Sequence, residues 1–198
     1  FIEKAKRKSS KIFFTEDFSS SDFDLNLKTN YQRKNMSTAF AAIQILFGNK
    51  ITNDIFKRGI LNLRGNTLLR GRWEKVMNKP LVIADVAHNE DGFKEVISEI
   101  NRIKAHKKIF VLGFVKDKPI EKIIKLFPKE GIFFFSSPKI SRALSSKNLK
   151  LILKNTDINF QIFESIQEAY KRALNNASKE DFIFVGGSNF TVSEILNP

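Results

Sequence analysis

The sequence contains no cysteine and only two histidines, His88 and His106, among its 198 residues. Without thiols it cannot form disulfides, thiolate zinc sites, iron–sulfur clusters or a cysteine nucleophile. Two imidazoles are also too few for a histidine-rich metal centre, and they leave little for a catalytic triad. The missing thiols exclude thiol chemistry, and the two imidazoles leave little for a histidine-based centre.

Long apolar runs are also absent, and no segment approaches the roughly 18 residues that a membrane-spanning helix requires. Residues 1–10 are basic and lack the apolar core and cleavage site of a signal peptide. We therefore expect a cytoplasmic protein with no membrane partner. Because the chain begins at Phe1 and not at Met, we also expect it to be a piece of a longer protein.

The formal net charge is +13. Such an excess of positive charge favours an anionic partner, which would be a nucleic acid, a nucleotide or a polyacidic substrate. The alternative is compositional drift, because lysine, isoleucine, asparagine and phenylalanine are abundant, as an AT-rich genome would give. The lysines form no long basic block, and zinc-finger, RRM and KH motifs are absent. We therefore expect no nucleic-acid partner.

The last two thirds of the chain alternates strand and helix patterns. Short, continuously apolar runs predict strands at 81–86, 108–114, 132–136, 158–163 and 181–185. Helical periodicity between them covers 91–103, 120–127, 141–153 and 165–177, and a last helix is expected after Ser188. Continuous apolarity indicates strands that are buried on both faces. The pattern predicts an α/β fold with a doubly wound, mostly parallel sheet flanked by helices.

The first 68 residues follow a different pattern, with strands expected at 11–15 and 23–27 and helices at 32–47 and 53–61. Two strands and two helices bury little core on their own. We therefore interpret residues 1–68 as the tail of a preceding domain that ends in a linker, 64–72, and residues 69–198 as the second domain.

Polar residues follow the first predicted core strand, as Asp85-Val86-Ala87-His88-Asn89. In doubly wound sheets, ligands bind beyond the carboxyl ends of the strands. There Asp85 suits a ribose diol, and His88 and Asn89 suit a carboxylate or an amine. Alternatively, Asp85 or Asn89 only caps the following helix. A metal held by Asp85 and His88 would need a third ligand that the sequence does not reveal.

The later strands are followed by loops 113–119, 137–142 and 186–190. The first carries lysines that suit anionic groups, and Arg142 in the second can grip a carboxylate with two hydrogen bonds. The third opens a helix whose N-terminus favours anions. The structural alternatives are an exposed charged loop, a solvated arginine and Ser188 as an N-cap. The P-loop pattern G-x-x-x-x-G-K-[ST] is absent from the chain.

In their order and spacing, these motifs resemble the C-terminal half of the folylpolyglutamate synthase/dihydrofolate synthase family, within the Mur ligase superfamily. The motifs are Gly71-Arg72-Trp73-Glu74, Asp85 to Asn89, Gly113 to Lys118, Ser137-Pro138 with Arg142, and Gly187-Ser188. Upstream, Tyr31-Gln32-Arg33-Lys34-Asn35 resembles the His-Gln-x-x-Asn segment at the end of the family's central ATPase domain. The resemblance covers nearly all of this chain but only about the last half of the family's length.

The resemblance implies a Rossmann-like Mur ligase C-terminal domain at 69–198 and the remnant of an α/β ATPase domain at 1–68. Its reaction joins L-glutamate to dihydropteroate or folate, through an acyl phosphate made from ATP, with ATP and Mg²⁺ as cofactors. The family's P-loop, magnesium ligands and modified lysine would lie upstream of Phe1. The chain is therefore expected to be a fragment that is inactive without the N-terminal ATPase domain of the same protein.

Site residues follow from the same resemblance. Asn35 would lie near the adenine, Arg72 at the ATP phosphates and Asp85 at the ribose, while His88 and Ser188 would place the incoming glutamate. Arg72 and His88 are the residues expected to act in catalysis. Four others are expected only near the cleft: Gln32, Asn89, Lys116 and Arg142. The chain departs from the family at three positions, where Tyr31 replaces histidine, Val86 replaces glycine and Pro119 replaces an acidic residue.

Other functions fit parts of the sequence. Another Mur-type amino-acid ligase would share the architecture and the strand-end aspartate, although the Asp-x-Ala-His-Asn motif, the Lys-Asp-Lys loop and the Gly-Ser turn favour the folate branch. A non-catalytic module that binds a nucleotide or an acidic metabolite would show affinity as an isolated chain. A basic nucleic-acid binder, marked by affinity that falls steeply with salt, ranks last.

Overall fold

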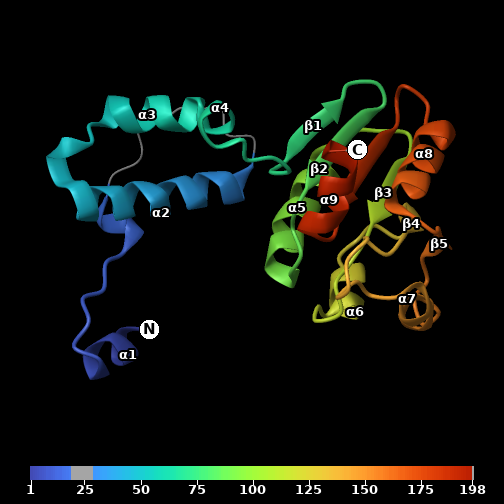
Figure 1. The fold of residues 1–198 in the computed structure, drawn as a ribbon, viewed down its shortest axis with the longest axis horizontal. Helices are drawn as coiled ribbons and strands as arrows, with labels where there is room; N and C mark the ends of the chain where they lie inside the picture. The colour runs from blue at the N-terminus through green and yellow to red at the C-terminus, as the bar shows by residue number, and fades with distance from the viewer. Residues whose placement is uncertain (19–28, 198) are drawn as a thin grey trace. The chain divides into compact units, whose positions relative to one another are not determined.

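The computed structural model describes residues 1–18 and 29–197. The chain forms two compact units, Phe1–Leu68 and Leu69–Pro198 (Figure 1), called unit 1 and unit 2 below. The strand expected at 23–27 lies outside the described residues. Within the described ranges, no helix combines the length and the apolarity that crossing a membrane requires.

Unit 2 is built on a six-stranded sheet in the order β1-β2-β6-β3-β4-β5. The strands are β1 (Glu74–Met77), β2 (Leu81–Asp85), β3 (Lys108–Leu112), β4 (Ile132–Phe135), β5 (Asn159–Ile162) and β6 (Phe182–Gly186). The edge strand β1 is antiparallel to β2, and all other neighbours are parallel. The predicted α/β fold with a mostly parallel sheet is confirmed. β1 was not predicted from the sequence, because its four residues alternate between half-buried and exposed and carry little apolar signal.

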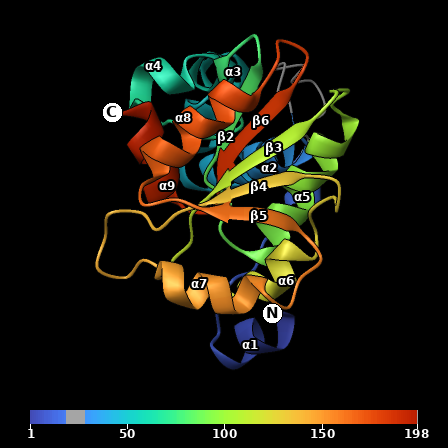
Figure 2. The same ribbon diagram turned by 90° about the vertical axis from the view of Figure 1, so that its right-hand side faces the viewer.

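Helices cover both faces of this sheet (Figure 2). They are α5 (Glu90–Arg102), α6 (Ile120–Ile124), α7 (Ser146–Leu153), α8 (Ile166–Asn176) and α9 (Asn189–Leu196). The first three pack against one face and the last two against the other. Right-handed crossovers explain this division: the chain moves outward from β2 to β5, then turns back through α8 to insert β6, which places α8 on the opposite face.

Phenylalanine fills much of the core between the sheet and helices α5 to α7. The Phe110 ring stacks on Phe133 with centroids 4.9 Å apart and meets the Phe127 ring edge-on at the same distance. Such pairs contribute about 0.5–1.5 kcal/mol each beyond the burial of their area. The three central strands of this sheet end at the same height. Asp85 of β2 and Leu112 of β3 both pair in register with Gly186 of β6.

Unit 1 contains helices α1 (Ile2–Arg7), α2 (Asn30–Phe47), α3 (Asn53–Leu61) and α4 (Leu63–Thr67), with short 3-10 turns at Thr15–Asp17 and Gly48–Lys50. The helices expected at 32–47 and 53–61 are confirmed. The strand expected at 11–15 is wrong, because residues 11–14 are exposed and pair with no strand among the described residues. The expected linker 64–72 begins as a helix. The core of the unit is small and centres on Met36, Phe40 and Phe56.

At the amino ends of the central strands, Asp181 joins two loops. Its carboxylate, 2% exposed, accepts the backbone N–H of Lys107 at 3.0 Å and that of Ser178 at 2.7 Å. Burial alone would raise the pKa of Asp181, but hydrogen bonds from Ser178 and Lys107 outweigh it and hold the pKa below its ordinary value of 3.8. The charged form is therefore the one that stabilises the fold.

We expect Asp181→Asn to destabilise unit 2 by about 1–3 kcal/mol at pH 7, because the amide accepts fewer of these hydrogen bonds. A carboxylate with a lowered pKa contributes stability above its unfolded pKa and loses it as the pH falls through the folded pKa. The difference between the two proteins should therefore shrink as the pH falls below 3.8. Urea denaturation followed by fluorescence of Trp73, the single tryptophan, measures it. A difference that is constant with pH would contradict the role of the charge.

Candidate functional site

The carboxyl ends of β2, β6 and β3 form a topological switch. The loops after β2 and β3 lead to α5 and α6 on one face, whereas the loop after β6, the strand between them, leads to α9 on the other. Loops that diverge in this way leave a crevice at the strand ends, where α/β sheets bind ligands.

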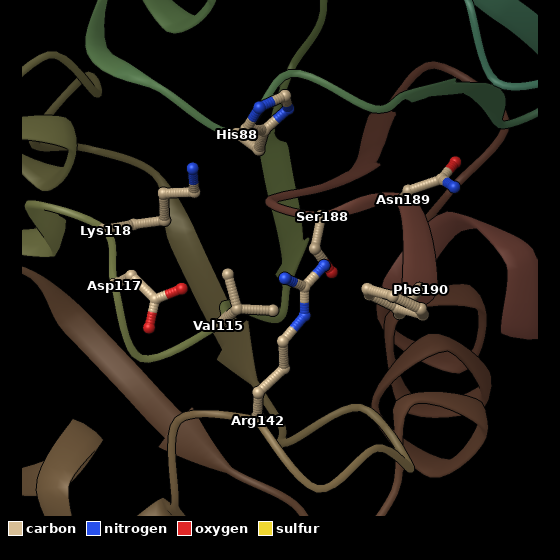
Figure 3. A pocket seen from close by; sticks show the side chains of 8 residues that line it. All are labelled: His88, Val115, Asp117, Lys118, Arg142, Ser188, Asn189 and Phe190. Atoms are coloured by element: carbon tan, nitrogen blue, oxygen red, sulfur yellow. The ribbon is translucent and has the colours of Figure 1, made fainter.

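A cavity of about 150 Å³ opens at this switch (Figure 3). It is lined by residues from the loops after β2, β3, β4 and β6 and from the first turn of α9: His88, Val115, Asp117, Lys118, Arg142, Ser188, Asn189 and Phe190. Pockets for drug-sized ligands run from about 300 to 1,000 Å³, so this cavity suits a smaller metabolite. Its lining combines two fixed cations, one carboxylate, an imidazole and an aromatic ring.

Asp85, at the end of β2, is 2% exposed and accepts two backbone hydrogen bonds. One carboxylate oxygen accepts the N–H of Trp73 at 2.7 Å, and the other accepts the N–H of Ala87 at 2.8 Å. Trp73 has a positive φ of 48°, a strained conformation that the hydrogen bond to Asp85 helps to hold. The exposed Arg72 lies in the same turn. Asp85 therefore fixes the backbone that presents Arg72.

The turn that contains Arg72 and Trp73 is also held to the loop after β2 by a hydrogen bond at Gly71. The N–H of the buried Val86 donates to the carbonyl of Gly71 at 2.9 Å. A Cβ on Gly71 would lie 2.8 Å from Cγ1 of Val86 and 2.7 Å from Cγ1 of Val192. The valine that departs from the family pattern is thus a packing residue, which fits only because position 71 has no side chain.

His88 and Asn89 lie in the loop after β2 and make different contacts. Nδ1 of His88 lies 3.1 Å from the carbonyl oxygen of Val86. Because a carbonyl only accepts, Nδ1 carries the proton in the neutral ring and Nε2 keeps a free lone pair. The ring itself lies at the rim of the cavity (Figure 3). Asn89 instead caps α5, where its Oδ1 accepts the N–H of Gly92 at 2.8 Å.

Ser188 caps α9 and ties that helix to β3. Its Oγ accepts the N–H of Thr191 at 3.1 Å and lies 2.8 Å from the Thr191 hydroxyl. That hydroxyl donates to the carbonyl of Gly113 at 2.9 Å, so the proton between the two hydroxyls comes from Ser188. The N-cap interpretation of Ser188 is confirmed. The residue is 2% exposed, and its hydroxyl already holds three elements together.

The loops after β3 and β4 are joined by a short antiparallel bridge between Val115 and Ala143. The N–H of Lys116 donates to the carbonyl of Arg142 at 3.0 Å, and a second bond on the other side of the bridge closes it. The helix predicted at 141–153 therefore begins only at Ser146, because residues 141 and 142 form a turn and Ala143 belongs to this bridge. The side chain of Arg142 turns into the cavity, with Cζ 5.3 Å from the centroid of the Phe190 ring.

Comparison with known proteins now identifies the domain. The family described as "Mur ligase, glutamate ligase domain" matches residues 71–189, which is more than half of the chain. The chain belongs to the Mur ligase family. The resemblance to folylpolyglutamate synthase/dihydrofolate synthase is confirmed as well, since relatives of that name and FolC structures match this Mur ligase domain.

Three relatives show the extent of the match. The dihydrofolate synthase/folylpolyglutamate synthase of Buchnera aphidicola subsp. Acyrthosiphon pisum (strain APS) is 34% identical over 82% of this chain and 39% of that protein. The structure of E. coli FolC in complex with DHPP and ADP has a TM-score of 0.70 and 26% identity, covering 82% of this chain and 37% of that one. The UDP-N-acetylmuramoyl-L-alanyl-D-glutamate--2,6-diaminopimelate ligase of Buchnera aphidicola subsp. Baizongia pistaciae (strain Bp) is 32% identical over 65% of this chain and 27% of that protein. The chain thus spans less than half of each.

The Mur ligase domain brings together only part of the predicted site. His88 and Ser188 line the cavity, whereas Asp85 lies at the end of β2 and is not part of the lining. Arg72 is exposed beside β1 and does not line the cavity. Lys116 also lies outside the lining, where its Nζ donates to the Ser141 carbonyl at 3.3 Å.

Asn35 and Gln32 belong to α2 of unit 1, where Asn35 is exposed. Asp117 and Phe190 also line the cavity, but the sequence assigned neither of them a role of its own. Within the described residues, no cluster of three or more His, Cys, Asp or Glu side chains suits a metal ion.

Proposed function

We propose that the chain is the C-terminal part of an ATP-dependent ligase that adds L-glutamate to dihydropteroate or folate through an acyl-phosphate intermediate. The supporting observation is the convergence of His88, Lys118 and Arg142 on one small cavity at the switch of a Mur ligase domain. The relatives named for this activity, and the FolC structure described with DHPP and ADP, support the same choice.

In this reaction ATP supplies the phosphoryl group that activates the carboxylate. The amine of glutamate then forms a C–N bond at the acyl carbon, the C–O bond to phosphate breaks, and the amine loses a proton. His88 fits the place of proton acceptor, because its Nε2 is unprotonated in the neutral ring and the ring lies at the cavity rim. Arg72, exposed and held by its turn, fits a contact with the phosphates, where a guanidinium offsets developing charge.

Asp85 is proposed to contact the ribose, because a carboxylate at the carboxyl end of a strand suits hydrogen bonds from a diol. Ser188 is likewise proposed to place glutamate, acting through the helix N-terminus that its hydroxyl caps. Mg²⁺ is part of the proposal too, with its ligands outside residues 1–18 and 29–197.

For unit 1 we propose the remnant of the central ATPase domain, with Asn35 near the adenine. Of the 15 large apolar side chains exposed among the described residues, 12 lie in unit 1. A unit this short that leaves so much apolar surface uncovered matches part of a larger domain. The rest of that domain would supply the P-loop, and the whole would act in the cytoplasm.

The test is ADP release that requires both L-glutamate and dihydropteroate. We expect none from the 198-residue chain, because it lacks the P-loop pattern, and we expect it from a longer protein that carries this chain together with an ATPase domain. Turnover by the isolated chain would contradict the fragment interpretation. Turnover of the longer protein with 2,6-diaminopimelate in place of L-glutamate would favour the second candidate, a cell-wall amino-acid ligase, which the relative at 32% identity supports.

A further inference from the structure

The turn that carries Arg72 places it between two residues of positive φ. Gly71 has a φ of 71° and Trp73 a φ of 48°. A positive φ is unfavourable for a residue with a Cβ, so the turn keeps this shape only while other contacts hold it. Asp85 supplies one such contact, by accepting the N–H of Trp73 at 2.7 Å. That bond leaves the role of Glu74, the last residue of the turn, unexplained.

Glu74 holds the other side of the turn with both of its carboxylate oxygens. Oε2 accepts the N–H of Gly71 at 2.8 Å, while Nε and Nη2 of Arg70 donate to Oε1 at 3.1 and 2.8 Å. The Glu74 side chain is only 10% exposed, so water screens this pair less than it screens a pair on the open surface. The carboxylate therefore closes the turn through the residue directly before Arg72.

Arg70 orients the Glu74 carboxylate and also binds the end of α9. Its third nitrogen, Nη1, donates to the carbonyl of Leu196, the last residue of that helix, at 2.8 Å. A cation there satisfies one of the carbonyls that a helix leaves open at its C-terminus. Every nitrogen of the Arg70 guanidinium thus donates to an acceptor within unit 2. An anionic ligand could bind Arg70 only by breaking these contacts, whereas Arg72 is exposed.

We propose that Glu74 is the positioning residue for Arg72 and that Arg70 serves to orient Glu74. The assignment rests on the proposed function, in which Arg72 contacts the phosphates of ATP. It divides the tasks of the two arginines that flank Gly71, because Arg70 fixes the turn and Arg72 meets the ligand. A contact with developing charge depends on placement, and a group that lies about 1 Å out of place can cost about a hundredfold in rate.

The hold on the turn is tested first, without any ligand, on the 198-residue chain. Glu74→Gln keeps the size of the side chain but has one accepting oxygen, so it cannot hold both Arg70 and the N–H of Gly71. We expect hydrogen exchange of the Trp73 amide, followed by NMR, to become about tenfold faster, which is the worth of one hydrogen bond to a charged group. The heteronuclear NOE of the Arg72 amide should fall as well.

Two further variants frame this measurement. Arg70→Gln is milder, because Glu74 keeps its contact with Gly71, and it should quicken exchange of the Trp73 amide by about two- to fivefold. Glu99→Gln is the matched control. The Glu99 side chain is 11% exposed and pairs with Arg102 at 3.0 Å on α5, outside the turn, so its loss should leave the Trp73 amide unchanged.

The consequence for Arg72 is tested by ADP release from a longer protein that carries this chain. Glu74→Gln should lower kcat by about tenfold to hundredfold while KM for ATP changes by less than about threefold. A double-mutant cycle then asks whether Glu74 acts through Arg72. In an Arg72→Gln protein, adding Glu74→Gln should lower kcat by less than about twofold, since the positioned group is already gone. Glu99→Gln should leave kcat and KM unchanged in both backgrounds.

Each contrary outcome has a definite meaning. Unchanged exchange of the Trp73 amide in Glu74→Gln would overturn the positioning role without any assay of the ligase. A loss of kcat that is as large in the Arg72→Gln background as in the original would also overturn it, because Glu74 would then act by another route. If the unmodified longer protein released no ADP, the proposed function would fall, while the ligand-free exchange measurement would still decide whether Glu74 holds the turn.

Discussion

Replacing Gly187 by alanine is expected to destabilise unit 2 by about 3 kcal/mol or more, because two costs combine. Gly187 has a φ of 101°, a conformation that a residue with a Cβ adopts only under strain. A Cβ there would also lie 2.6 Å from the carbonyl oxygen of Gly113 and 3.1 Å from the Phe114 ring. The obstacle is backbone at the end of β3, which cannot rotate away.

Urea denaturation monitored by Trp73 fluorescence measures this loss, since Trp73 packs against the core of unit 2. Gly59→Ala provides the control. Nothing lies within 4 Å of the Cβ it would introduce in α3, and a helical Gly→Ala change gains about 0.5–1 kcal/mol locally. The Trp73 transition should be unaffected by that change, because α3 belongs to unit 1. A Gly187→Ala protein that is as stable as the original would contradict this expectation. It would show that the ends of β3 and β6, which border the cavity, can move apart to accept the Cβ.

Asp85→Ala is expected to cost about 2–4 kcal/mol of unit 2 stability, because two backbone N–H groups lose their acceptor in a buried place. One of them belongs to Trp73, whose φ is 48°. Without the carboxylate this turn should relax and carry Arg72 away from its position. We therefore also expect the ADP release of a longer protein carrying this chain to fall more than the loss of stability explains, when it is assayed at a temperature where the variant stays folded.

The variant Asp181→Ala separates the loss of stability from the loss of ADP release. Asp181 is equally buried and also accepts two backbone N–H groups, but at the opposite end of the strands. It should lose comparable stability in the urea titration while the folded protein keeps its ADP release. If both alanine variants lowered ADP release equally, Asp85 would have no role beyond stability. If Asp85→Ala left stability unchanged, the hydrogen bonds to Trp73 and Ala87 would not be the reason for its burial.

Buried carboxylates hold loops to this sheet at both ends of its strands. Asp85 and Asp181 lie at opposite ends of neighbouring strands, and each uses both oxygens to hold a loop to the sheet. Cavities also open at the amino ends of the strands, and one of them is lined by Lys104, His106, Lys108 and Glu180 among others. Carboxylates at both ends therefore stabilise the fold, and only the one at the carboxyl end also positions a residue of the proposed site.

Several features followed from the sequence because they depend on neighbouring residues. The strand at 81–85 is apolar on both faces, the stripe on α5 repeats every three to four residues, and Asn89 and Ser188 cap the helices they precede. The position of polar residues just after each strand also followed, since parallel strands end at one edge of the sheet. These patterns were enough to predict the α/β fold and to direct attention to His88, Arg142 and Ser188.

Other features were decided only by the tertiary structure, because they depend on contacts between distant segments. The insertion of β6 between β2 and β3 is set by how the return crossover packs, and this insertion places Ser188 beside the loop of Lys118. The bridge between Val115 and Ala143 ends the helical pattern at 141–145 against its local preference. The Arg142–Phe190 contact joins residues 48 positions apart, one in the β4–α7 loop and the other in the first turn of α9. Local composition determined which elements form, and long-range packing determined which charges meet.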